Sequence, residues 1–480
     1  MVFWLTNFSN ALAESHAGSY LSAIHAEKKF DFVSASQFYS NGLRIEPTNQ
    51  KLLLGAIRSN ISSGKFDKAK LYSKNLVKIG SDTPISSLMI LADEIRNENF
   101  KKAKSLLEKP DQFNFFLKAI LTGWVEIGSG NIEKGLDYFE NSENAKRLGY
   151  ISQNHLGLAL ALVGNFEKAD LILSNTSNGA SIDRRDMAIA HAQIMAQLGK
   201  NKEAVKMLDK FLVGNENNKM SKLRRAIDAG APVSFDYLSS PKEGAALALY
   251  TIANAINKED DYSLSLIYAQ LVSHINNNNP KNILLISENL VKLKQYELAI
   301  ENYAKIPLDH LQYNNAEVGR ANALFIQGKE DAAIEVLKAL TKANPSNLEL
   351  QTTLGNTLRR SLKFSEAVNS YTKSISFLNE QNLESWFEYY ARGICYERLG
   401  NWTLAEKDFR IALKIHPNQP SLLNYFGYSL VEKGIHLDEA LQLIKRAVEK
   451  QPDDGYITDS LGWALYRLGK YSEAVIHMER

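Results

Sequence analysis

The sequence predicts an all-α fold, a solenoid of about thirteen antiparallel helix hairpins in two blocks. Three observations predict it. A short string of the kind seen at Gly400–Ala405 recurs along the chain at a spacing close to 34 residues. Between the strings, apolar residues recur three and four positions apart, which is the period of an amphipathic helix. Only 11 of the 480 residues are proline, so little interrupts long helical segments.

The repeat period is measured from the small residue that closes each string. Within each half of the chain, successive closing residues lie 32 to 38 residues apart, most often 34. A fixed period of this length is the signature of one supersecondary unit stacked many times. In the first half the closing residues are Ala35, Ala69, Ala103, Gly135, Ala169 and Ala204. In the second half they are Ser265, Ala299, Ala333, Ala367, Ala405, Ala440 and Ala474.

The unit 386–419 shows how one repeat builds a hairpin. Its two helical stretches are separated by the turn Gly400-Asn401. Gly393 and Ala405 are small, so we expect the two helices to cross there, with Phe409 filling the wider gap one turn further on. A hairpin of this kind leaves one apolar face that only the next hairpin can cover.

This pattern resembles the tetratricopeptide repeat, a helix–turn–helix unit of the same length. The resemblance covers nearly all of unit 386–419, and it is weakest in units 84–115, 246–279 and 280–313. It implies a right-handed superhelix in which the first helix of each hairpin lines a concave groove, through positions 2, 5, 9, 12 and 13 of the repeat. It also implies a function in binding proteins or peptides.

The domain organisation follows from the period. Residues 16–218 are predicted to form an N-terminal block of about six repeats, and residues 246–480 a C-terminal block of about seven, the last one truncated. Between them, 219–245 breaks the period and reads as an irregular connector; a docking loop is the alternative. We assign residues 1–15 to the remnant of a signal peptide or to an N-terminal tail, because Ala11-Leu12-Ala13 has the small-x-small form of a cleavage site.

The C-terminal half also resembles, more narrowly, a family of exported tetratricopeptide proteins of α-proteobacteria. The strings that carry this resemblance are Leu423–Leu430, Pro452–Trp463 and Glu243–Tyr250. The function of that family is unassigned, so the resemblance implies only a compartment. It favours the periplasm or cell envelope, with the cytoplasm as the alternative.

The sequence contains no recognisable catalytic or cofactor motif. The 56 Lys and Arg residues nearly balance the 54 Asp and Glu residues, so there is no strongly basic face for nucleic acid. Cys395 is the only cysteine, and the nine histidines do not stand in metal-ligand spacing. The sequence contains no run of about 18 apolar residues, the length needed to span a membrane. We therefore expect no enzyme activity, cofactor, metal site, nucleic-acid binding or membrane span.

The predicted function is a non-catalytic protein–protein interaction scaffold that binds an extended peptide or protein surface in its groove. A cytoplasmic adaptor and the regulatory part of a larger enzyme are the alternatives. A chaperone-type clamp for a C-terminal carboxylate is disfavoured, because Asn356 is followed in the next unit by Ala391 where the clamp needs asparagine. The predicted groove residues are Asn356, Arg359, Arg360, Tyr390, Arg398, Asn424, Tyr428 and Trp463.

Overall fold

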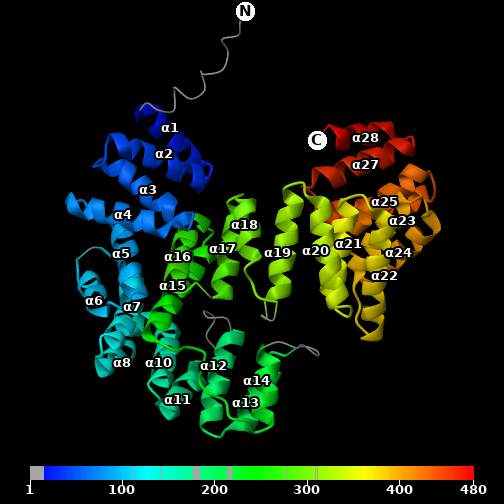
Figure 1. Cartoon of the computed structure of the whole chain (residues 1–480). Helices are drawn as coiled ribbons and strands as arrows, with labels where there is room; N and C mark the ends of the chain where they lie inside the picture. The colour runs from blue at the N-terminus through cyan, green and yellow to red at the C-terminus, as the bar shows by residue number, and fades with distance from the viewer. Residues whose placement is uncertain are drawn as a thin grey trace, which may run out of the picture. The chain divides into compact units, whose positions relative to one another are not determined.

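The computed structural model describes residues 16–110, 112–141, 143–176, 184–212, 219–277, 279–308, 310 and 312–479. Within these residues the chain forms 28 helices and no strand (Figure 1). The chain divides into two compact units, Met1–Gly319 and Arg320–Arg480. The predicted signal-peptide remnant at 1–15 lies outside the described residues.

The first unit contains eighteen complete helices among its described residues. They are α1 (His16–Lys28), α2 (Phe32–Ile45), α3 (Gln50–Ser62), α4 (Phe66–Lys78), α5 (Pro84–Arg96), α6 (Phe100–Leu107), α7 (Phe115–Gly128), α8 (Ile132–Glu140), α9 (Glu143–Leu148), α10 (Tyr150–Leu162), α11 (Phe166–Thr176), α12 (Arg184–Gln197), α13 (Asn201–Asp209), α14 (Lys219–Asp228), α15 (Pro241–Lys258), α16 (Tyr262–Ile275), α17 (Pro280–Lys292) and α18 (Tyr296–Tyr303).

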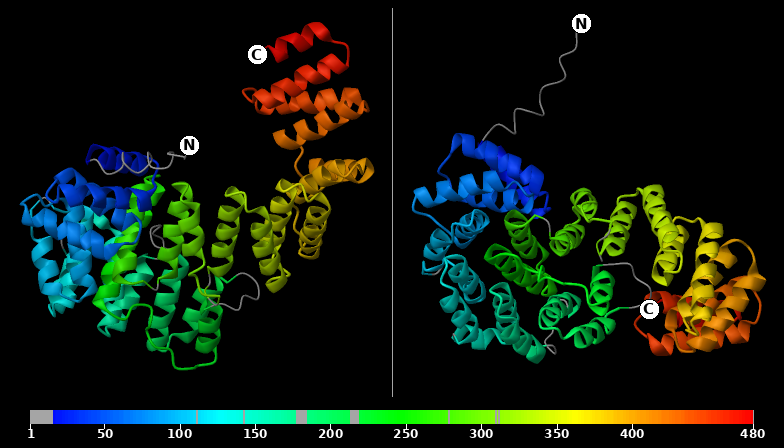
Figure 2. Two further views of the ribbon diagram at one scale, coloured as in Figure 1. Left: turned by 45° about the horizontal axis from the view of Figure 1, so that its top comes forward. Right: turned by 60° about the horizontal axis from the view of Figure 1, so that its bottom comes forward.

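The boundary between the units falls inside α19 (Tyr313–Ile326). The second unit continues with α20 (Glu330–Ala343), α21 (Leu348–Arg360), α22 (Phe364–Glu380), α23 (Trp386–Arg398), α24 (Trp402–Ile415), α25 (Pro420–Lys433), α26 (Leu437–Lys450), α27 (Gly455–Arg467) and α28 (Tyr471–Met478). Figure 2 shows the hairpins α21–α22 to α27–α28 following one another in chain order, from yellow to red. Across the described residues, the helices form thirteen consecutive hairpins, with α9 and α14 as additional single helices, so the predicted all-α fold of thirteen hairpins is confirmed.

Local sequence explains why each hairpin turns where it does. In the hairpin α23–α24, Gly400 has a φ of 76°, a left-handed conformation that a glycine adopts without strain. The backbone N–H of Asn401 then donates to the carbonyl of Tyr396 at 2.8 Å, which closes the end of α23. The helices also approach closely at Gly393, where a Cβ atom would lie 2.7 Å from the ring of Phe409. The predicted crossing at Gly393 is therefore present.

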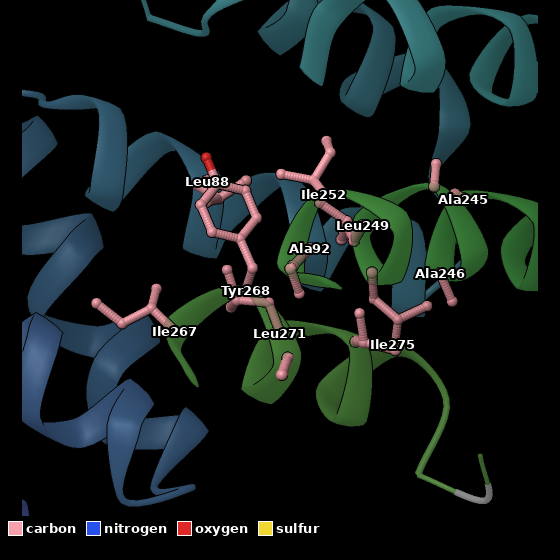
Figure 3. Packing of buried hydrophobic residues seen from close by; sticks show 14 of the residues in the cluster. Leu88, Ala92, Ala245, Ala246, Leu249, Ile252, Ile267, Tyr268, Leu271 and Ile275 are labelled. Carbon is pink, nitrogen blue, oxygen red and sulfur yellow. The ribbon is translucent and has the colours of Figure 1, made fainter. Parts of the chain in front are cut away.

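The first unit folds back on itself. Helices α15 and α16 pack against α3, α5, α7 and α10, which are the first helices of four earlier hairpins (Figures 1 and 3). Figure 3 shows this packing, with Leu88 and Ala92 of α5 facing side chains of α15 and α16. Polar contacts accompany it, since Gln270 donates to the carbonyl of Ser62 at 3.2 Å. A single core therefore joins residues that are about 180 to 210 positions apart in the chain.

The compact units do not coincide with the predicted repeat blocks. Residues 241–275 lie in the first unit, and the division between the units falls at 319/320, whereas the repeat period breaks at 219–245. The connector itself is partly helical, because residues 219–228 form α14. The segment that follows is held in place by Gln193, whose side-chain oxygen accepts the backbone N–H groups of Asp236 and Tyr237 at 3.2 and 3.1 Å.

Candidate partner-binding face

The first helices of the hairpins carry the positions that the sequence assigns to a groove, and the two units treat these positions differently. In the first unit, α3 and α10 each bury nine of their thirteen residues, because α15 and α16 cover them. In the second unit, α21 and α23 each bury five of thirteen. We call the exposed and half-exposed side chains of α21, α23, α25 and α27 the first-helix face.

The residue types at these positions agree with the difference in burial. In α5 and α7, positions 5, 9 and 12 of the repeat are all buried and apolar; they are Leu88, Ala92, Ile95, Ile120, Trp124 and Ile127. In the second unit most of the corresponding positions hold charged, amide or aromatic side chains, although Ile394 and Val431 are apolar and buried. An apolar run at groove positions was therefore a signal in the sequence for a face covered by the chain itself.

Asn356 and Arg359 lie on α21 and meet at one buried hydroxyl. The Tyr371 O–H donates to Oδ1 of Asn356 at 2.7 Å, and Nε of Arg359 donates to the Tyr371 oxygen at 3.4 Å. Burial raises the pKa of Tyr371 to about 12, so this hydroxyl stays protonated. These two predicted site residues thus support the packing of α21 on α22, and only the outer part of Arg359 is available to a partner.

Arg360 and Arg398 are exposed, as predicted for groove residues. The Arg360 guanidinium lies 4.0 Å from the centre of the Phe325 ring and makes no ion pair among the described residues. The Arg398 side chain is 58% exposed, and its closest carboxylate is Glu397 at 3.4 Å. Both guanidinium groups can therefore donate hydrogen bonds to an acidic or carbonyl group on a partner.

Tyr390 takes part in packing between hairpins. Its ring centre lies 5.7 Å from that of Trp386, 5.8 Å from that of Tyr425 and 6.3 Å from that of Phe409. Burial raises the pKa of its hydroxyl. The structure thus assigns this ring chiefly to the core of the second unit.

Asn424, Tyr428 and Trp463 lie together on α25 and α27. Tyr428 is 39% exposed, and the Oδ1 atom of Asn424 is buried with no hydrogen-bond partner among the described residues. Nε1 of Trp463 donates to Oε1 of Glu432 at 2.6 Å, which joins α27 to α25. The Trp463 ring also stacks on Tyr466, with a centroid distance of 5.5 Å and an interplanar angle of 16°.

Two carboxylates of these first helices, one buried and one exposed, were not among the predicted site residues. Glu388 is only 6% exposed and accepts a hydrogen bond from Thr352 at 3.0 Å, while its second oxygen is buried and unpartnered within the described part of the chain. Glu432 occupies position 13 of its repeat. That position is one of those that line the groove in the family, so the position rule alone could have found it.

The rest of the molecule offers weaker candidates. The described residues contain no group of three or more His, Cys, Asp or Glu side chains that could hold a metal ion. A cavity of about 290 Å³ in the first unit lies between α12, α15 and segment 236–238, but its Lys281 already pairs with Asp186. Cys395 is buried and its pKa is raised to about 12, so its thiol is protonated. No helix in the described ranges has the length and apolar character needed to cross a membrane.

Comparison with known proteins points to one repeat family. Family models of the tetratricopeptide repeat match residues 386–419 and 427–480. A TPR repeat-containing protein of Pseudomonas aeruginosa is 36% identical over 85 residues, a segment that covers 18% of this chain and 14% of that protein.

Solved structures give more distant likenesses. A chain from the APC/C hetero-tetramer Cut9-Hcn1 is 13% identical with a TM-score of 0.39, over 94% of this chain and 96% of that one. A chain of MamA is 23% identical with a TM-score of 0.29, over 33% of this chain and 90% of that one.

Proposed function

We propose that this tetratricopeptide-repeat protein is a protein–protein interaction scaffold that binds an extended segment of a partner along the first-helix face of its second unit. One observation carries the proposal. On α5 and α7 of the first unit the equivalent positions are apolar and are covered by α15 and α16, whereas the face of the second unit keeps charged and aromatic side chains exposed. Arginine and aromatic side chains are the residue types that dominate the energetics of protein interfaces.

The proposed contact between the partner segment and the first-helix face does not resemble a clamp for a C-terminal carboxylate. Asn356 is engaged by Tyr371, and Ala391 is buried where such a clamp places an asparagine. The first-helix face runs over the first helices of four successive hairpins. An extended segment can contact such a face through its backbone groups and through side chains at intervals along it. The alternative, that the chain is the regulatory part of a larger enzyme, uses the same face for a catalytic partner.

Site-specific photocrosslinking tests the face. A photoreactive phenylalanine analogue replaces Arg398 or Tyr428 on the first helices, or Lys407 or Lys445, which are exposed on the second helices α24 and α26, as matched controls. We expect adducts with the same partner from both first-helix positions and none from the controls. Adducts that form equally at all four positions, or only at the controls, contradict the proposal.

We also propose that the chain works in the cell envelope. The support is the Ala11-Leu12-Ala13 string and the resemblance of the C-terminal half to exported proteins. Fractionation of cells that express the chain with a C-terminal tag is the test. Recovery in the periplasmic fraction is expected, and recovery in the cytoplasm alone supports the adaptor alternative.

A further inference from the structure

We propose that the part of the first-helix face formed by α25 and α27 binds a lysine or arginine side chain of the partner; this inference rests on the proposed function. The residues concerned are Tyr428, Glu432, Asp459 and Trp463, which we call the acidic aromatic patch. Trp463 packs partly against the core of the second unit and joins α27 to α25, whereas Tyr428, Glu432 and Asp459 are exposed, so the patch faces solvent.

The carboxylate of Glu432 joins the two helices of the patch. Nε1 of Trp463 donates to it from α27 at 2.6 Å, and Tyr428 lies one turn before it on α25. Asp459 lies one turn before Trp463 on α27, so the two residues of each helix share one side of that helix. Burial, followed by the charges of Glu432 and Asp459, raises the pKa of the Tyr428 hydroxyl, which agrees with this placement.

The two carboxylates of the patch have no ion-pair partner in the part of the chain that the structure describes. Among the described residues, neither Glu432 nor Asp459 forms an ion pair within 4.0 Å. The adjacent basic side chains are placed against rings: the ammonium group of Lys433 lies 5.0 Å from the Trp402 ring centre, and Arg467 lies 5.8 Å from that of Trp463. Two negative charges are thus left without a partner on an exposed surface.

A lysine or arginine side chain complements this surface in two ways. Its charge is attracted by the two carboxylates, and its cationic head can lie against an aromatic face, which adds a cation–π contribution. The opposite end of the first-helix face carries the guanidinium groups of Arg360 and Arg398. Because the two ends differ in charge, a partner segment with a basic residue at one end and an acidic residue at the other binds in only one direction.

A displayed library of random peptides, selected on the full chain, tests the inference. We expect the selected peptides to share a Lys or Arg at one position. In fluorescence anisotropy with a labelled selected peptide, replacement of that residue by Gln should weaken binding about tenfold, as should Glu432→Gln with Asp459→Asn. Glu432→Gln keeps an oxygen for Trp463, so the fold is retained, and circular dichroism checks this.

The two changes should not add. If the peptide cation binds the patch, replacing that cation by Gln should not weaken binding to the doubly substituted chain any further. The Gln peptide should then bind the unchanged chain and the doubly substituted chain with equal affinity. Asp438→Asn with Glu449→Gln on α26 removes the same charge from exposed positions and should leave binding unchanged.

The outcomes separate this inference from the proposed function. Selected peptides that lack a basic position, or that bind the patch variant as well as the unchanged chain, overturn the basic-residue site. If those peptides still crosslink to Arg398 and Tyr428 positions, the first-helix face stands. If no peptide is selected, or if peptides crosslink only to the second helices, both proposals fail.

Discussion

Gly244→Ala tests whether the first unit is closed by α15 as tightly as its packing indicates. An added methyl group at Gly244 would lie 2.6 Å from Cε2 of Trp124, about 1 Å inside the optimal carbon–carbon separation. Trp124 cannot move aside easily, because it is fully buried and its Nε1 donates to Nδ1 of His155 at 3.0 Å. Overpacking of this kind costs about 1–3 kcal/mol, and alanine returns up to about 1 kcal/mol of helix propensity. Because Trp124 cannot relax, the overpacking cost lies in the upper half of its range, about 2–3 kcal/mol, and the expected net loss in local stability is about 1–2 kcal/mol.

Hydrogen exchange of the backbone amides in α7 and α15 measures this loss directly. A loss of about 1–2 kcal/mol corresponds to exchange about 5–30 times faster than in the unchanged chain. Gly455→Ala in α27 is the matched control, because nothing lies within 4 Å of its would-be Cβ atom. It should leave exchange unchanged or slow it slightly. Unchanged exchange in α7 and α15 of Gly244→Ala would refute the tight closure of the first unit.

Three further predictions concern buried groups. Burial lowers the pKa of His155 from 6.5 to about 3. As the pH falls through that interval, the unfolded chain takes up a proton that the folded chain does not, so the free energy of unfolding falls by about 1.4 kcal/mol per pH unit. Urea titrations should therefore show a shallower pH dependence for His155→Gln. The pKa of the Cys395 thiol is raised to about 12 by burial, so its alkylation in the folded chain should be on the order of a hundredfold slower than in urea. Asp408 binds the mostly buried Arg392 guanidinium at 2.7 and 2.9 Å, and Asp408→Asn removes this charge partner. The substitution should lower the free energy of unfolding in urea by about 3–5 kcal/mol. Glu406→Gln, which affects the ion pair with Arg410, should cost under about 1 kcal/mol.

The hairpins could be predicted because their determinants are local. A turn glycine, a small residue at the crossing and an aromatic ring one turn on all lie within a single repeat, as at Gly393 and Phe409. The period then gives the number of hairpins and the packing of neighbours. It contains no information on contacts between repeats that are far apart, so the break in the period at 219–245 gave no indication that α15 and α16 pack on α5 and α7.

The closure of the first unit nevertheless leaves traces in the sequence. Helix α16 has no continuous polar face, and ten of its fourteen residues are buried. A helix that is apolar on all sides is buried on all sides. Of the three repeats that match the family pattern least, 84–115, 246–279 and 280–313, the first two contain α5, most of α15 and α16. Their departure from the pattern reflects packing against distant repeats as well as against neighbours.

The sequence indicated on which helices the candidate residues lie but not the directions of their side chains. Position within the repeat places a residue on the first helix, and Arg360, Arg398 and Tyr428 are exposed there as expected. The rotamer decides whether the side chain turns outward or into the next hairpin. Arg359 reaches the buried Tyr371 hydroxyl for this reason, and no pattern of residue types along one chain specifies that choice.

The same repeat positions are covered by the chain itself on α5 and α7 and exposed on the first-helix face, and side-chain chemistry accounts for the difference. Apolar side chains such as Leu88 and Trp124 gain free energy when α15 and α16 remove them from water, and the small Gly244 lets the helices approach closely. Covering Arg360 or Glu432 with an apolar helix would instead bury an unpaired charge, which costs several kcal/mol. A segment that covers the second unit must therefore bring its own carboxylate or cation. That requirement excludes a hairpin like α15–α16 from the first-helix face and favours a partner with complementary charges.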